Sequence, residues 1–136
     1  MSNESKYERR FNPLEMSVDE AGGYIQRVPL CMDDALYTEF PSSPLTARVL
    51  IWIVKKASNL TYLSGKDEIQ AVKISSTELG RRLRTTQQCV AKCLKELVVS
   101  KWITNTNTKK CSTGVYLVDF EKVRVSTQRY FMEFGE

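Results

Sequence analysis

The clearest structural pattern in this chain lies in residues 74–103, ISSTELGRRLRTTQQCVAKCLKELVVSKWI. It begins with a short helical pattern in which Ser75 can cap the helix and Glu78, three residues later, completes a capping box. Leu79 and Leu83 fall four apart on one face, and the small Gly80 lies where a second helix would cross closely. The pattern predicts a first helix of about two turns.

A second helical pattern follows after a very short connection. Thr86 can cap this helix, and Val90, Leu94 and Leu97 repeat at intervals of four and three to form one apolar stripe. Only residues 84–85 remain between the two helices, which is too short for anything except a helix-turn-helix corner.

Burial of that stripe leaves a defined set of side chains on the outer face of the second helix. A glutamine amide offers a donor and an acceptor and can pair with adenine, whereas lysine can donate to guanine or to phosphate. An alanine is short enough to let the helix backbone come close to a base pair. This face therefore predicts a helix that reads DNA bases in the major groove, through Gln87, Gln88, Ala91, Lys92 and Lys95.

The segment resembles the helix-turn-helix of many bacterial winged-helix regulators and replication proteins. Their consensus is roughly S-x-x-E-L-A-x-x-L-G-[IV]-S-x-x-T-V-x-[RK]-x-L-x-x-L-x-x-x-G-[LI]-I. The chain departs from it at Arg84 and Lys101, where glycines are usual, and at Cys89, where threonine is usual. The matching positions are Ser75, Glu78, Leu79, Gly80, Leu83, Thr85, Thr86, Val90, Lys92, Leu94, Leu97 and Ile103.

The resemblance extends upstream, over residues 23–58. This part is similar to the DNA-binding domains of phage replication protein O-type and plasmid replication-initiator proteins, which open with a "GY-x-R-[IV]-P" strand. It implies origin binding, although an operator-binding regulator would share the same chemistry. The matching residues are Gly23, Tyr24, Arg27, Val28, Pro29, Ala35, Leu36, Leu45, Thr46, Val49 and Leu50.

Charge is unevenly distributed along the 136 residues, whose net charge is +4. Residues 75–114 carry eight basic and two acidic side chains, a net charge of +6, whereas residues 1–74 and 115–136 each carry −1. Nearly all of the positive excess therefore lies on the predicted helix-turn-helix and on the segment after it, which favours a polyanionic partner.

The remaining patterns predict one α+β domain that is mainly α, a winged helix with a two-stranded wing and extra terminal segments. We expect residues 1–22 to form a polar, flexible arm, residues 23–122 the winged-helix domain, and residues 123–136 a C-terminal helix or arm whose aromatic side chains need burial. We expect a helix at Leu45–Leu60, strands at Ala71–Ile74, Trp102–Thr106 and Val115–Phe120, and a polar turn at Asn107–Gly114.

These patterns predict a cytoplasmic, sequence-specific double-stranded DNA-binding protein that controls transcription or replication. A homodimer is expected because one helix-turn-helix reads only a half-site. The candidate dimer surfaces are the Leu45–Leu60 helix and the C-terminal segment. Replication or transcription proteins are possible partners, and a winged-helix adaptor that binds protein without DNA is the alternative. We expect DNA contacts from Ser76, Arg84, Thr86, Gln87, Gln88, Ala91, Lys92, Lys95, Lys109 and Lys110.

Other classes of protein are disfavoured. The chain has no histidine and no glycine-rich phosphate loop, so we expect neither an enzyme nor a cofactor. Cys89 and Cys93 lie four apart, a spacing that metal sites can use, but we expect both to pack inward as reduced thiols. The longest apolar run, residues 49–54, is too short to span a membrane.

Overall fold

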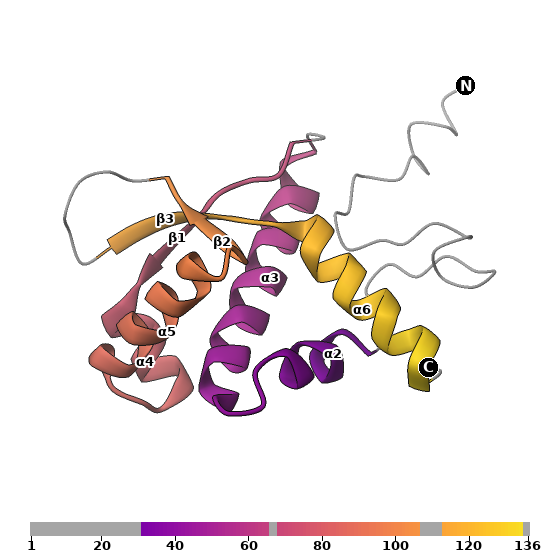
Figure 1. The fold of residues 1–136 in the computed structure, drawn as a ribbon. Helices are drawn as coiled ribbons and strands as arrows, with labels where there is room; N and C mark the ends of the chain where they lie inside the picture. Colours follow the sequence, from indigo (N-terminus) through magenta and orange to yellow (C-terminus); the bar gives the residue numbers. More distant parts are fainter. Residues whose placement is uncertain (1–30, 66–67, 107–112, 135–136) are drawn as a thin grey trace, which may run out of the picture.

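A computed structural model describes residues 31–65, 68–106 and 113–134 of the chain (Figure 1). The arm predicted for residues 1–22, the strand predicted at residues 23–29, and Lys109 and Lys110 of the predicted polar turn lie outside these ranges.

Helix α3 (Pro44–Ser64) runs through the middle of the fold. Pro44 occupies its first turn after Ser43, because a proline there loses no helical hydrogen bond. The helix continues four residues beyond the predicted end at Leu60, until Gly65 adopts a left-handed conformation with a φ of 73°. Val49, Leu50 and Ile53 are fully buried, so α3 packs on more than one side.

Helices α4 (Ser76–Leu83) and α5 (Gln87–Val99) pack against each other and are joined by a three-residue turn. Each has the predicted cap, since Ser75 Oγ accepts a hydrogen bond from Glu78 N at 3.3 Å and Thr86 Oγ1 accepts one from Cys89 N at 3.1 Å. These bonds satisfy backbone donors that have no partner within the helix. Both caps confirm the helix starts that the sequence predicted.

A small antiparallel sheet packs beside these helices, in the order β1–β3–β2. Its strands are β1 (Val72–Ser75), β2 (Ile103–Asn105) and β3 (Thr113–Val118). The two strands predicted after α5 pair with each other as β2 and β3, and β1, for which no partner was predicted, pairs with the other edge of β3 and makes β3 the central strand. Burial alternates along β1, with Val72 and Ile74 buried, so one face of this strand packs on the core while its backbone pairs with β3.

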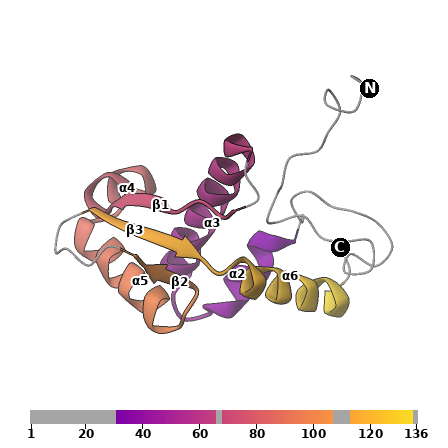
Figure 2. The ribbon, with the colours of Figure 1, turned by 90° about the horizontal axis from the view of Figure 1, so that it is seen from above.

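The last described helix, α6 (Phe120–Phe134), confirms a helix in place of an arm. It begins at Phe120, which had been predicted as the end of the preceding strand, because Asp119 caps it by accepting a hydrogen bond from Lys122 N at 3.1 Å. Helix α2 (Met32–Glu39) packs against both α6 and α3. Figures 1 and 2 both place α4 and α5 on one side of α3, and α6 on the other.

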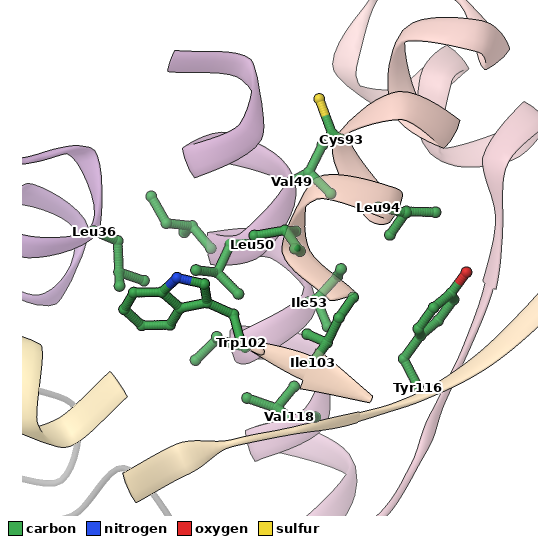
Figure 3. Close-up of a cluster of buried hydrophobic side chains, with 14 of the residues drawn as sticks. Leu36, Val49, Leu50, Ile53, Cys93, Leu94, Trp102, Ile103, Tyr116 and Val118 are labelled. Atoms are coloured by element: carbon green, nitrogen blue, oxygen red, sulfur yellow. The ribbon is translucent and has the colours of Figure 1, made fainter. Parts of the chain in front are cut away.

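One apolar core joins these elements, and Figure 3 shows side chains from α3, α5 and the sheet converging in it. Trp102 is only 4% exposed and the centroid of its ring lies 5.8 Å from that of Phe40, so it is a core side chain. The prediction that the C-terminal aromatics become buried was wrong at Phe134, which is 63% exposed. The described part of the chain is thus an α+β fold that is mainly helical.

Candidate nucleic-acid interface

Helix α5 is anchored to the core along one face, as the apolar stripe predicted. Val90, Leu94 and Leu97 are at most 4% exposed. Burial of a side chain of this size contributes about 1.5–3 kcal/mol, so the stripe strongly determines which face of α5 turns inward. The opposite face is left to solvent.

A polar contact adds to this anchoring on the flank of α5 that faces α3. The fully buried Thr46 of α3 donates its hydroxyl to Glu96 Oε1 at 2.9 Å, and the Thr46 Oγ1 atom also lies 3.4 Å from Cys93 Sγ. Glu96, one of two acidic side chains in the basic segment, is thereby turned toward α3 and away from the outer face of α5. The sequence did not reveal this contact, because it joins residues 50 positions apart.

The C-terminal end of α5 is tied to α6. Lys122 Nζ donates to Ser100 O at 2.5 Å and lies 4.7 Å from the centroid of the Trp102 ring. A cation suits this place because the carbonyl groups at a helix C-terminus carry partial negative charge and the face of an indole attracts cations. Lys101, where the resembling proteins have glycine, adopts a positive φ of 67° just beyond the helix.

The outer face of α5 presents the five side chains predicted for it, all exposed: Gln87, Gln88, Ala91, Lys92 and Lys95. Within the described ranges, the side chains of the two glutamines and two lysines form no hydrogen bond or ion pair. Their donors and acceptors are therefore available to a ligand at no cost in internal contacts.

A hollow of about 450 Å³ lies between this face of α5 and the sheet. Ser76, which was predicted to contact DNA, lines it but is only 8% exposed, so little more than one edge of its side chain is accessible. Asn105 and Tyr116 form the opposite wall and are paired across β2 and β3. Neither residue was among the predicted site residues. The alternation of inward and outward side chains in the predicted strand at Val115–Phe120 was the one pattern that could have indicated Tyr116.

The turn between α4 and α5 is held in a tight conformation. Arg84 adopts a left-handed conformation with a φ of 59° and a ψ of 48°, at the position where the resembling proteins carry glycine. A Cβ on Gly80 would lie 3.0 Å from Thr85 O and 3.2 Å from Thr86 C, so only glycine fits comfortably there. The close approach is thus to the turn backbone, and not to a crossing helix as predicted.

Positive charge surrounds the start of α5. Thr86, Arg81 and Arg84 are exposed there, and neither arginine forms an ion pair in the described part of the chain. Arg82 is partly neutralised by Glu78, at 3.3 Å. Together with Lys92 and Lys95, Arg81 and Arg84 give the α4–α5 unit an excess of exposed cations that form no ion pair among the described residues, which suits a polyanion.

Cys89 corrects one prediction. Cys93 is buried, as expected, but Cys89 is exposed on the first turn of α5. Hydrogen bonds to Thr86 and then to Thr85 lower the pKa of the Cys89 thiol, and the charge of Lys92 acts in the same direction. The thiol therefore belongs to the outer face of α5 and not to the core.

Within the described ranges, no group of three or more histidine, cysteine, aspartate or glutamate side chains could hold a metal ion. No described helix is both long and apolar enough to cross a membrane. Comparison of the chain with protein-family models, with curated proteins and with solved structures finds no significant match.

Proposed function

We propose that this protein is a winged-helix, sequence-specific double-stranded DNA-binding protein, with α5 as its recognition helix and the β2–β3 hairpin as its wing. The observation that carries the proposal is the outer face of α5, where Gln87, Gln88, Lys92 and Lys95 are exposed and form no side-chain hydrogen bond or ion pair with the residues that the structure describes. Amide and ammonium groups on one helix face are the donors and acceptors that read base edges in a major groove.

The anchoring of α5 supports this proposal. Base readout requires side chains held in a fixed orientation, because a misplaced donor loses the energy of its hydrogen bond. Helix α5 is capped by Thr86 at its start, held on its inner side by Thr46 and tied at its end by Lys122. Such a rigid helix favours direct readout over nonspecific attraction to phosphate.

Phosphate contacts would come from the cationic groups beside α5. Arg84 projects from the turn before the helix, and the backbone N–H groups of the first turn add partial positive charge. Lys109 and Lys110, in the segment that joins β2 to β3, complete the proposed phosphate-binding set. Contacts of this kind position a protein on a duplex without reading its sequence.

The proposed role is control of transcription or of replication at an operator or origin. A selection of bound sequences from a random duplex pool tests the proposal, followed by titration of the selected duplex and a scrambled duplex at several salt concentrations. We expect one enriched sequence and an affinity for both duplexes that falls with salt, because bound cations displace counterions. A pool that shows no enrichment, together with binding that salt does not change, would overturn the proposal.

A further inference from the structure

Helix α6 has an outer face with no partner in the described structure. Its inner face packs on α2, with Val123 fully buried and Thr127 only 1% exposed. On the outer side, Val125 is 40% exposed and Met132 is 74% exposed. These two side chains are seven residues apart, or about two helical turns, and therefore lie along one line of the helix.

Polar side chains fill the interval between these two apolar groups. A shallow hollow of about 470 Å³ is lined by Val125, Gln128, Arg129, Met132 and Glu133. Arg129 and Glu133 are one turn apart, exposed, and without an ion pair among the described residues. The face is thus electrically neutral, with its positive group nearer the start of the helix and its negative group nearer the end.

Such a face is complementary to a second copy of itself. In a two-fold arrangement with the helices antiparallel, the order of charges on one helix is reversed on the other, so that each arginine meets a glutamate. We propose that two copies of this chain form a homodimer through α6, with Arg129 of each copy paired with Glu133 of the other. Met132 then lies close to the two-fold axis.

The other surface that the sequence suggested for a dimer is not available. The apolar side chains of α3 that would form such an interface, Val49, Ile53 and Ala57, are fully buried within the protomer. The described exposed apolar residues near the end of α3, Tyr62 and Leu63, lie beside no complementary pair of charges on that helix. Helix α6 is therefore the better candidate.

The length of α6 limits the area that a dimer interface on this helix can bury. Its 15 residues form a helix about 22 Å long. A single pair of such helices buries no more than the low end of specific interfaces, about 1,200 Å² in total. Because interfaces this small belong to the weak, transient class, we expect a dissociation constant in the micromolar range.

The dimer would fix the two α5 helices relative to each other, because Lys122 near the start of α6 is bonded to Ser100 at the end of α5. Two recognition helices in a fixed relation could read two half-sites, which is how this inference extends the proposed function. Dimerisation through α6 does not require DNA. It can therefore be tested without DNA.

Sedimentation of the full chain over a concentration range of about 100-fold around the expected constant tests the proposal. Met132→Glu should raise the dissociation constant by at least about tenfold, because two carboxylates would be buried near the axis. Val99→Glu is the matched control, since Val99 is equally exposed at 74% but lies on α5. It should leave self-association unchanged.

A charge exchange tests the pairing itself. Arg129→Glu and Glu133→Arg should each weaken the dimer on the order of tenfold by opposing like charges, and the double variant should restore it. Circular dichroism should show all variants folded, since the changed side chains are exposed. A monomeric parent, a dimer indifferent to Met132→Glu, or a double variant that fails to recover would each overturn the proposal. None of these results would bear on the proposed binding of DNA.

Discussion

Replacing Arg84 with glycine should make the protein more stable and, at the same time, a weaker DNA binder. Arg84 occupies the left-handed region with a φ of 59°, and its side chain forms no hydrogen bond or ion pair in the described structure. It therefore contributes to the turn only through its backbone, whose N–H donates to Arg81 O at 3.3 Å. Glycine retains that bond.

The gain in stability follows from two opposing contributions. A left-handed conformation costs a residue with a Cβ about 1–2 kcal/mol, and glycine avoids this cost. Glycine loses more backbone entropy on folding, worth about 0.5–1 kcal/mol. The free energy of unfolding should therefore rise by about 0.5–1 kcal/mol, which corresponds to a Tm increase of about 2–5 °C for a domain of this size.

Thermal unfolding and DNA titration together test this reasoning. If Arg84 contacts a phosphate, Arg84→Gly should also flatten the slope of log affinity against log salt by about 0.9. Lys101→Gly is the control, because Lys101 has a φ of 67° but lies at the far end of α5. The Lys101→Gly variant should gain a similar free energy of unfolding and show the same slope of log affinity against log salt as the parent. An Arg84→Gly protein that gains no stability, beside a stabilised Lys101→Gly protein, would refute the account of the turn.

Three further changes have defined outcomes. Gly80→Ala should lower the free energy of unfolding by about 1–3 kcal/mol in a urea titration, because its Cβ would press on the backbone at Thr85; unchanged stability would show that the turn yields. Thr86→Ala should cost about 0.5–2 kcal/mol in the same assay, and Thr86→Ser should keep most of that stability; equal losses would exclude the cap. Neutralising Lys109 and Lys110 together should flatten the salt slope by about 1.8 and weaken binding to every duplex alike, whereas an unchanged slope would place both away from phosphate.

Local chemistry explains what the sequence predicted well. The starts of α4 and α5 followed from Ser75 and Thr86, because a cap acts through hydrogen bonds to residues three positions away. The outer face of α5 followed from the spacing of Val90, Leu94 and Leu97, because helical geometry fixes which side chains oppose a buried stripe. No contact between distant segments was needed for either inference.

Most of what the sequence did not predict depends on contacts between segments that are distant in the chain. Pairing of β1 with β3 depends on which edge of β3 is accessible in the folded protein. The pattern of residues within either strand carries no information about that edge. The contact of Thr46 with Glu96 is of the same kind. The error at Cys89 is instead local: Cys89 shares a helix face with the buried Cys93, but it lies on the first turn of α5, where this face is still exposed.

The most direct test of the central claim compares Gln88→Ala and Lys92→Ala with the parent, each titrated against the selected duplex and against random duplex at one salt concentration. Base-edge contacts predict a loss of about 1–3 kcal/mol on the selected duplex and little change on random DNA. Lys55→Ala, which changes an exposed lysine on α3 paired with Asp33, should bind both duplexes like the parent. Equal losses on both duplexes for Gln88→Ala and Lys92→Ala would contradict the account, because side chains that discriminate between bases cannot affect all sequences alike.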